Sequence, residues 1–519
     1  MNKQTARKFR IAAAVLLAYL ILLILLVLAE KDAAGASIVS LPLAFWYSVT
    51  TLTTVGYGDT FPVTFWGRLI GFVFQLMSLG VLLAILGLLL RMIRGRILPR
   101  IRLALSRKQN WYIFPFASEE ALTLAKHLRE EEPESRLIFS YADREKADPV
   151  LKAICCELDL PSLIESKKGS EPAVLCLDPD PAVNEKLAAD LAGLPCRVCL
   201  LGIREADSMP AGQSVCDPYE SCARLYWHRY PVLNPQERIV LVGGGRYAGA
   251  LLEQGLMLNL IDPGQHLSYT LCGDWGEFRR NHPDLEKQAA DQGLFGGDSL
   301  SFSEGPWNQD YTIFQNADRI LFCGDDEAQI DRQAADLFRY CPVRAAVYVR
   351  SRAGFDPAIC FGSADELFTP ELVLRRRLSR LAIRLHETYC RSTGKAMPDW
   401  DHLGEFLRRS NLASADHLYI KACLLRGKAP DDAPPASETE AYREALALYE
   451  ALDESGKDRC RRIEHLRWCR FHLLNNWHYA PERDNAQRLH PLLVPFDRLS
   501  PEEQAKDDYA WQLLAEAAE

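Results

Sequence analysis

A seven-residue stretch, residues 53–59, has the sequence Thr-Thr-Val-Gly-Tyr-Gly-Asp, which suits the binding of a dehydrated cation. A cation that loses its water shell needs other oxygens around it, and successive main-chain carbonyls can supply them. Such carbonyls point the same way only if some residues leave the ordinary φ/ψ regions, which glycine does at little steric cost. Gly56 and Gly58 stand where this is needed. The candidate oxygens are the carbonyls of Thr54, Val55, Gly56 and Tyr57, and the Thr54 hydroxyl.

The residues before this stretch must hold it in place. Residues 41–52 are a short apolar run opened by Pro42, too short to cross a bilayer. We expect a re-entrant helix packed inside protein, with the carboxyl end of its dipole facing the ion path.

Two longer apolar runs flank this segment. Residues 11–29 span about 30 Å as a helix, and residues 69–90 form a second, uncharged run. A signal peptide is the alternative for the first run, but no small-residue cleavage site follows it. Four basic residues precede the first run and seven follow the second, which places both termini in the cytoplasm. The sequence predicts a multi-pass protein of the inner (plasma) membrane, in contact with the lipid bilayer.

Residues 1–109 thus resemble the pore module and linker of two-span prokaryotic potassium channels. The resemblance implies K⁺ ions in a selectivity filter made of Thr54, Val55, Gly56, Tyr57 and Gly58, with four chains around one axis in a homotetramer.

Gly80 lies midway along the second run, where the inner helices of such channels bend. The resemblance implies a gating hinge there, and a small residue that lets helices approach closely is the alternative. No run carries regularly spaced arginines for the membrane potential to move. Gating must therefore come from elsewhere in the chain.

Composition separates this module from the rest of the 519 residues. Residues 1–110 carry a net charge of +10 and the remainder −19, with no basic stripe that would indicate a nucleic-acid partner. All 15 cysteines lie at Cys155 or later, which fits a reducing cytoplasm. Cys196-x-x-Cys199 is a single pair, with no second pair or nearby histidine cluster to complete a tetrahedral site, and the histidines form no pair at helical i, i+4 spacing, so we expect no metal.

From residue 110 onward, short β-type runs alternate with helical ones, which is typical of parallel sheets with crossover helices. We expect two α/β Rossmann-like domains, residues 110–236 and 237–371, and both resemble the regulator-of-K⁺-conductance (RCK) domains that follow two-span pores. The first departs from the family at Pro115 to Ser118, where a glycine-rich turn is expected. We expect that domain to be structural.

The second domain carries the G-x-G-x-x-G/A pattern after a strand at 239–242. Gly243 would make the tight turn, Gly245 would admit phosphate, and Ala248 takes the third small position. A second strand is expected over 258–262, ending in Asp262, which could bind ribose hydroxyls. The pattern predicts a nucleotide or dinucleotide cofactor, although such domains also persist as empty scaffolds.

Residues 372–519 are expected to be helical. Within them, Glu464-His465-Leu466-Arg467-Trp468, Asn476-Trp477-His478-Tyr479 and residues 490–508 resemble the repeat domain named after ryanodine receptors (RyR), over roughly 457–514. The aromatic and basic side chains could line a small-ligand pocket. The alternative is that the tryptophans anchor a small core. The candidate pocket residues are Arg467, Trp468, Trp477, Tyr479 and Arg483.

Together these features predict a multidomain protein: an all-α membrane pore with two spans and a re-entrant helix, two Rossmann-like domains and a C-terminal helical region. The expected function is a ligand-gated potassium channel whose cytoplasmic ring senses a small nucleotide-type ligand, with no catalytic residues. The alternative is a membrane-tethered nucleotide-processing enzyme that uses the second Rossmann-like domain. No Ser/His/Asp or Cys/His arrangement supports that alternative. A receptor-like effector that depolarises its host would share the channel mechanism.

Overall fold

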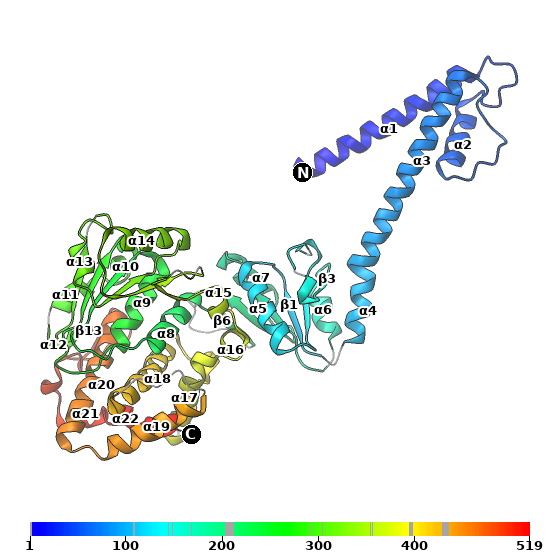
Figure 1. Cartoon of the computed structure of the whole chain (residues 1–519). Helices are drawn as coiled ribbons and strands as arrows, with labels where there is room; N and C mark the ends of the chain where they lie inside the picture. Colours follow the sequence, from blue (N-terminus) through cyan, green and yellow to red (C-terminus); the bar gives the residue numbers. More distant parts are fainter. Residues whose placement is uncertain are drawn as a thin grey trace. The chain divides into compact units, whose positions relative to one another are not determined.

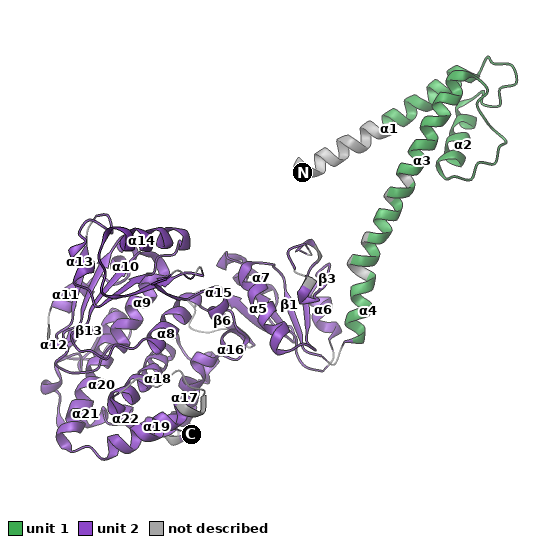
Figure 2. Cartoon of the chain, in the orientation of Figure 1, with its two compact units in different colours: residues 1–105 green, residues 106–519 purple. Residues whose placement is uncertain are grey.

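The computed structural model divides into two compact units, Met1–Leu105 and Ser106–Glu519 (Figure 2). It describes residues 3–106, 109–143, 145–147, 149–167, 169–202, 212–290, 292–303, 305–352, 354, 356–393, 398–427 and 435–518.

The first unit is helical (Figure 1). Its elements are α1 (Lys3–Glu30), α2 (Leu41–Leu52), α3 (Phe65–Met92), a short π-helical segment η1 (Ile93–Ile97) and α4 (Leu98–Leu105). Within the described residues, Phe65–Leu90 is the one helix long and apolar enough to cross a membrane, with a mean hydropathy of 2.5, and Leu17–Glu30 is a shorter apolar helix. The expected short helix before residue 53 is α2, whose Pro42 stands in the first turn, where proline is tolerated.

Hydrogen bonds between helices fix α2 against its neighbours. The hydroxyls of Tyr19 in α1 and Ser48 in α2 lie 2.6 Å apart. Ser78 in α3 donates to the carbonyl oxygen of Leu52 at 2.9 Å, satisfying one of the carbonyls that a helix leaves unpaired at its carboxyl end. Glu30 accepts from the main-chain amides of Val63 and Thr64 and so ties the end of α1 to the start of α3.

The second unit begins with a six-stranded parallel sheet in the order β3-β2-β1-β4-β5-β6. Its strands are β1 (Trp111–Phe114), β2 (Arg136–Ser140), β3 (Ile154–Cys156), β4 (Ala173–Cys176), β5 (Arg197–Leu201) and β6 (Gln213–Cys216). Its helices are α5 (Glu119–Glu131), η2 (Tyr141–Asp143), η3 (Pro149–Leu151), α6 (Leu160–Ser166), α7 (Pro181–Asp190) and α8 (Pro218–Arg229). After β1, the Ser118 hydroxyl caps α5 by accepting a hydrogen bond from the Ala121 amide. One of the unpaired main-chain amides at the start of α5 is thus hydrogen-bonded by a side chain of the protein.

The second sheet repeats this plan in the order β12-β11-β10-β7-β8-β9, again parallel throughout. Its strands are β7 (Arg238–Val242), β8 (Ser268–Cys272), β9 (Ser299–Ser303), β10 (Arg319–Phe322), β11 (Ala346–Arg350) and β12 (Ile359–Phe361). Its helices are α9 (Gly245–Leu258), α10 (Gly276–Asn281), α11 (Leu285–Ala290), α12 (Gln292–Phe295), α13 (Thr312–Gln315), α14 (Glu327–Tyr340), α15 (Ala364–Leu367) and α16 (Pro370–Val373). Both sheets have the doubly wound strand order, so the prediction of two Rossmann-like domains is confirmed.

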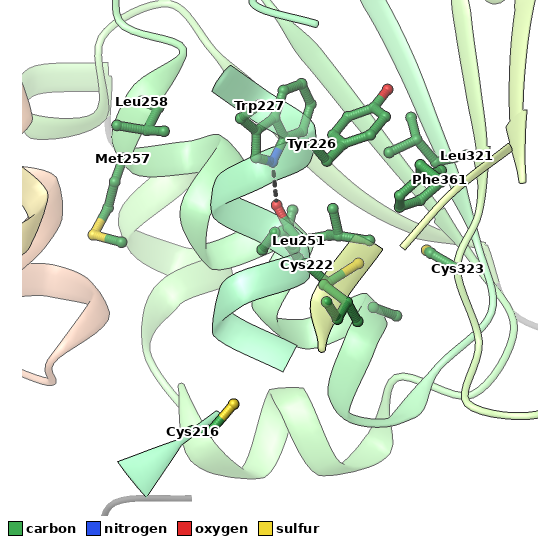
Figure 3. Close-up of a cluster of buried hydrophobic side chains, with 14 of the residues drawn as sticks. Cys216, Cys222, Tyr226, Trp227, Leu251, Met257, Leu258, Leu321, Cys323 and Phe361 are labelled. Carbon is green, nitrogen blue, oxygen red and sulfur yellow. Dashed lines mark hydrogen bonds between the residues drawn. The ribbon is translucent and has the colours of Figure 1, made fainter. Parts of the chain in front are cut away.

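The two sheet domains exchange helices. Trp227, on α8 after the first sheet, is fully buried against α9 of the second domain and donates to the Leu251 carbonyl at 2.8 Å (Figure 3). Gly255 permits this contact, because an added Cβ would lie 2.7 Å from the Trp227 ring. In the other direction, His127 of α5 lies 3.0 Å from the carbonyl oxygen of Phe368, between α15 and α16. The exchange couples the two domains.

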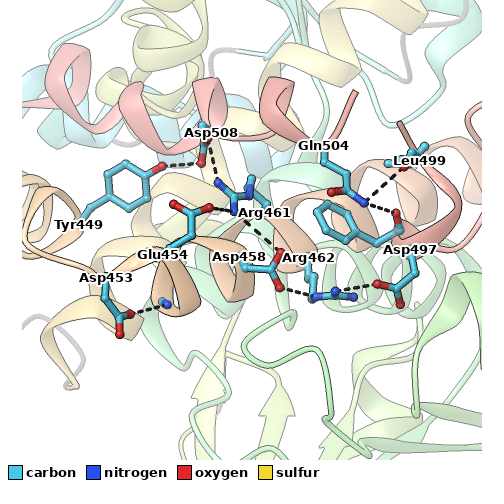
Figure 4. Close-up of polar contacts among 12 residues, drawn as sticks. Tyr449, Asp453, Glu454, Asp458, Arg461, Arg462, Asp497, Leu499, Gln504 and Asp508 are labelled. Carbon is cyan, nitrogen blue, oxygen red and sulfur yellow. Dashed lines mark hydrogen bonds and ion pairs between the residues drawn. The ribbon is translucent and has the colours of Figure 1, made fainter. Parts of the chain in front are cut away.

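The remaining chain is mainly helical, as predicted. Its elements are η4 (Arg377–Ser379), α17 (Arg380–Thr393), η5 (Trp400–His402), α18 (Glu405–Arg426), α19 (Pro435–Glu450), α20 (Glu454–Leu474), β13 (His478–Tyr479), β14 (Leu489–His490), η6 (Phe496–Arg498), α21 (Pro501–Lys506), α22 (Tyr509–Gln512) and α23 (Leu514–Ala517). On α20, Arg461 pairs with Asp508, and Arg462 bridges Asp458 and Asp497 (Figure 4).

A fully buried ion pair fixes this helical region to the second sheet domain. Arg470 of α20 contacts the Asp298 carboxylate at 2.6 Å, and neither side chain is exposed. The same guanidinium donates to the carbonyl oxygens of Leu256 and Phe295. A buried charge is tolerated only when it is paired and hydrogen-bonded. The helical region is therefore docked in a defined position on the second domain.

Candidate functional site

The stretch after α2 has an alternating backbone. Thr54, Gly56 and Gly58 have φ angles of 63°, 56° and 74°, whereas Val55 and Tyr57 between them have negative φ. Alternation between positive and negative φ turns successive peptide groups toward the same side of the chain. This is the arrangement that a column of carbonyl ligands requires.

Two hydrogen bonds show which side the carbonyls face. The main-chain amides of Val55 and Gly56 both donate to the carbonyl oxygen of Thr50, at 2.9 and 3.1 Å. In a trans peptide the C=O group points opposite to the N–H group of the same unit. The carbonyls of Thr54 and Val55 therefore point away from α2 and are free to bind a cation.

Trp46 and Asp59, which the sequence reasoning missed, brace the outer half of this stretch. The Trp46 indole donates to the Asp59 carboxylate at 2.8 Å. The Trp46 ring also lies parallel to the Tyr57 ring, with centroids 5.9 Å apart. An indole in the short helix and an acid directly after the last glycine were the available signals. The carbonyl column is thus held from both ends.

Gly80 lies within the continuous helix α3, and an added Cβ there would meet no atom within 4 Å in the single chain. The helical hydrogen-bond pattern changes instead at η1, residues Ile93–Ile97, at the carboxyl end of α3. Such π-helical turns are often found at functional sites. The hinge at Gly80 remains a prediction, with η1 as a second position where the helix could bend.

In the second sheet domain, the glycine-rich loop joins β7 to α9. Gly243 has a φ of 146°, and an added Cβ would lie 2.6 Å from the Gly324 amide nitrogen. Gly245 also has positive φ, at 82°. Ala248 is fully buried on α9. The local geometry is therefore that of a Rossmann turn, with β7 and α9 in close contact.

The phosphate position of this loop is filled by the protein itself. The Asp325 carboxylate accepts from the main-chain amides of Arg246 and Tyr247, each at 3.1 Å. It also lies 2.3 Å from the place where a Cβ of Gly245 would stand. A dinucleotide would put its pyrophosphate against these same amides. A pyrophosphate therefore does not fit this loop while Asp325 occupies it.

Arg350 holds Asp325 in this position. Its guanidinium donates to the carbonyl oxygens of Gly324 and Asp325, at 3.1 and 2.9 Å. It also lies over the Tyr247 ring, 4.1 Å from the centroid. The Arg350 side chain is buried, so the loop that carries Asp325 is anchored from the sheet.

The predicted strand over 258–262 is wrong. Helix α9 continues to Leu258, residues 259–262 form a loop, and the second strand is β8, Ser268–Cys272. Asp262 therefore precedes this strand, at the opposite end of the sheet from the glycine loop. Its carboxylate accepts from the Gly264 amide and pairs with Arg459 of α20. The acid that follows the second strand beside the glycines is Asp274, whose carbonyl oxygen lies 2.0 Å from a Cβ built on Gly244.

The structure places four of the five C-terminal candidate residues around His472: Trp468 and Trp477 contact its ring, and, besides burial, the charges of Arg467 and Arg483 help to lower its pKa. Arg467 is buried and pairs with Glu464 at 2.6 Å. Tyr479 is 56% exposed, and Arg483 donates to Asn485. Arg467 and Arg483 thus already have polar partners, and Tyr479 lies at the surface.

The two tryptophans are part of an aromatic cluster. The Trp468 ring is centred 4.0 Å from His472, and His472 lies 5.3 Å from Trp477, which is buried. Burial lowers the pKa of His472 to about 3, so its ring is neutral. Both tryptophans contribute to packing in this cluster. Among the described residues, no group of three or more His, Cys, Asp or Glu side chains is placed to hold a metal ion.

Comparison with known proteins assigns a class to two segments. Residues 12–95 match the family described as "Ion channel", and residues 447–514 match the family described as "RyR domain". The first segment contains the carbonyl column, and the second contains the aromatic cluster. The predicted resemblances to a potassium-channel pore and to an RyR domain are confirmed.

Individual relatives support the pore assignment. The "Potassium voltage-gated channel protein Shal" of Drosophila melanogaster is 49% identical over 43 residues, which are 8% of each chain. "Potassium voltage-gated channel subfamily A member 5" of Mus musculus is 51% identical over 43 residues, 8% of this chain and 7% of the relative. The chain thus matches less than a tenth of the length of these relatives.

Solved structures resemble the chain more loosely. "GsuK Channel" has 13% identity and a TM-score of 0.33, covering 70% of this chain and 97% of that one. "Crystal structure of the GsuK bound to ADP" has 13% identity and a TM-score of 0.31, covering 72% of this chain and 99% of that one. At these TM-scores the similarity carries no information about a ligand of this protein.

Proposed function

We propose that the protein is the subunit of a homotetrameric, K⁺-selective membrane channel. The observation that supports this most directly is the alternating backbone of residues 54–58, with two amides turned toward Thr50 and the carbonyls turned away. One chain supplies one column of oxygens, whereas a dehydrated K⁺ needs a ring of them. Four copies around an axis complete that ring.

The surface of the single chain is consistent with this assembly. Val55 is 53% exposed and Tyr57 is 68% exposed. Along α3, Leu82, Leu86 and other large apolar side chains are also about half exposed. Neighbouring copies and lipid would cover these apolar surfaces, as expected for a pore in the inner (plasma) membrane with both termini in the cytoplasm.

Opening of this pore is proposed to depend on the second unit. We propose that the two coupled sheet domains and the docked helical region form a body with more than one arrangement. A small nucleotide-type ligand that binds one arrangement more tightly would shift the gating equilibrium by its difference in affinity.

Potassium flux into liposomes tests the pore directly. Replacing Gly58 with Ala puts a Cβ on a residue with a φ of 74°, which costs about 1–2 kcal/mol and resists the alignment of carbonyls. We expect wild-type protein to conduct K⁺ and the Gly58→Ala variant to lose K⁺-selective flux. A matched variant, Gly35→Ala, lies at positive φ in the loop between α1 and α2, outside the carbonyl column, and should conduct. Selective K⁺ flux through Gly58→Ala would contradict the proposal.

A further inference from the structure

A cavity of about 490 Å³ lies between the second sheet domain and the helical region. Its walls come from α8, α9, α10 and α18, and the segment 372–379 adds to them. Small-molecule sites commonly have volumes of about 300–1,000 Å³ and prefer the boundaries between domains. Gly243, Asp274 and Asp325 do not line it. Gly245 and Arg246 of the glycine loop do line it, so the cavity begins beside the phosphate position that Asp325 fills.

One cationic group on the cavity wall is available for a ligand. Within the part of the chain that the structure describes, the Arg246 guanidinium has no ion-pair partner, and it lies 5.8 Å from the centre of the Tyr219 ring. Other arginines on the wall are already paired, as Arg409 is with Glu253 at 3.0 Å. Arg246 can thus bind an anion without breaking an existing pair.

Carboxylates on the same wall can accept hydrogen bonds. Asp217, Glu220 and Glu277 all line the cavity. Burial, reinforced by the charge of Glu220, raises the pKa of Asp217 to about 7. A carboxylate only accepts hydrogen bonds, whereas a protonated carboxyl also donates one, so hydroxyl or amino groups of a ligand suit this side and Asp217 can also donate near neutral pH.

Aromatic faces complete the lining. Tyr219 lies next to Arg246, and Phe278 and Phe471 contribute from α10 and α20. Stacking of a nucleobase on an aromatic side chain is worth about 1–3 kcal/mol. Phe278 and Phe471 are buried, whereas Tyr219 is partly exposed, so a flat ring system would stack on Tyr219.

We propose that this cavity binds a nucleoside phosphate: the phosphate at Arg246, the ribose or base donors at the carboxylates, and the base against the Tyr219 ring. A nucleoside phosphate supplies an anion, several donors and a flat ring in one molecule. The proposal rests on the proposed function, because it names the site and the chemical class of the ligand that controls the channel. The phosphate is placed at the Arg246 side chain and not at the main-chain amides of Arg246 and Tyr247, because Asp325 already accepts hydrogen bonds from both amides.

The position of the cavity gives the ligand a means of control. Arg224 of α8 pairs with Asp416 of α18 at 2.7 Å, and Arg409 of α18 pairs with Glu253 of α9 at 3.0 Å, all beside the cavity. These two pairs join α8, which follows the first sheet, to the helical region, and join the helical region to α9 of the second sheet domain. A ligand between them favours one spacing of α8, α9 and α18 over others.

Calorimetric titration of the full-length channel in detergent with ADP tests this. Gly249 lines the cavity, and an added Cβ meets its nearest atom, on Phe278, at 3.7 Å, so Gly249→Leu should fold with its extra side chain in the cavity. Arg246→Gln removes the unpaired cation. Arg280→Gln is the matched control, since Arg280 is an exposed residue of α10 that does not line the cavity.

We expect wild-type protein and Arg280→Gln to bind ADP equally, and Arg246→Gln and Gly249→Leu to bind it at least tenfold more weakly. Adenosine should bind more weakly than ADP to wild-type protein, with no further loss in Arg246→Gln. Unchanged ADP affinity in Gly249→Leu with loss in Asp274→Asn would place the ligand at the glycine loop and overturn the proposal. Absence of ADP binding to wild-type protein would also overturn it, whereas K⁺ flux through the same sample would leave the proposed channel intact.

Discussion

Replacing Asp325 with Ala separates two roles of the glycine loop. Asp325 accepts from two amides at the start of α9, as a capping residue does, and loss of such a cap costs about 0.5–2 kcal/mol. We therefore expect Asp325→Ala to lower the free energy of unfolding by about 1–2 kcal/mol. The same change empties the position where a phosphate would lie.

The neighbouring residue provides a matched control. Asp326 caps α14 by accepting from the Gln329 amide at 3.1 Å, so Asp326→Ala loses a comparable cap without opening the glycine loop. The two variants should lose similar stability. Only Asp325→Ala should gain a new phosphate position.

Stabilisation of the variants by ADP distinguishes them more clearly than the loss of stability does. A phosphate entering the wild-type loop must displace Asp325, and a cost of about 1–2 kcal/mol weakens binding roughly 5- to 30-fold. Because the cavity is present in all three proteins, its contribution to stabilisation by ADP is shared. We expect melting curves in detergent to show a larger ADP-dependent increase in Asp325→Ala than in wild type or Asp326→Ala. Equal increases in all three proteins, or no loss of stability in Asp325→Ala, would refute this account of the loop.

Three further changes probe the rest of the second unit. Burial, reinforced by the charge of Glu464, raises the pKa of Asp507 to about 8, so the folded state holds a proton that the unfolded state has lost. The free energy of unfolding should therefore fall by about 1.4 kcal/mol per pH unit as the pH rises from about 5 to 8. Melting curves of Asp507→Asn should lack this pH dependence, and an unchanged pH profile in that variant would contradict the assignment. Arg470→Met leaves the Asp298 carboxylate buried without its charge partner. It should lower the free energy of unfolding, measured with denaturant, by about 3–5 kcal/mol, and a decrease of less than about 1 kcal/mol would contradict this. Trp468→Ala should lower the melting temperature without changing the affinity for ADP, because the Trp468 ring lies against other side chains and does not line the cavity. A change in ADP affinity without a change in melting temperature would show that Trp468 contacts the ligand.

Features set by adjacent residues could be predicted from the sequence. The residues at 54–58 determine their own backbone, because the two glycines adopt positive φ with little strain. The doubly wound sheets followed from buried apolar runs separated by helical ones. In each case the information lies within a few residues of the element.

Features that depend on distant residues could not be predicted. Asp325 reaches the glycine loop from nearly eighty residues downstream, through the pairing of β10 with β7. The pairing of Arg467 with Glu464 is local, at i, i+3 spacing on α20, but the burial of this pair against Lys421 of α18 depends on a distant helix. The apolar run at 258–262 was read as a strand because a short apolar run does not distinguish a strand from a helix end with a buried loop. Pairing of charges and burial of loops are set by tertiary contacts.

The most direct test of the channel proposal is the reversal potential of the purified protein in a planar bilayer, with K⁺ on one side and Na⁺ on the other. If the alternating backbone at residues 54–58 lines a potassium filter, the current should reverse at a potential set by K⁺ alone. A single Gly56→Ala substitution, at a residue with a φ of 56°, should abolish that selectivity. A reversal potential near zero for the wild-type protein would show that the pore does not discriminate K⁺ from Na⁺ and would contradict the proposed function.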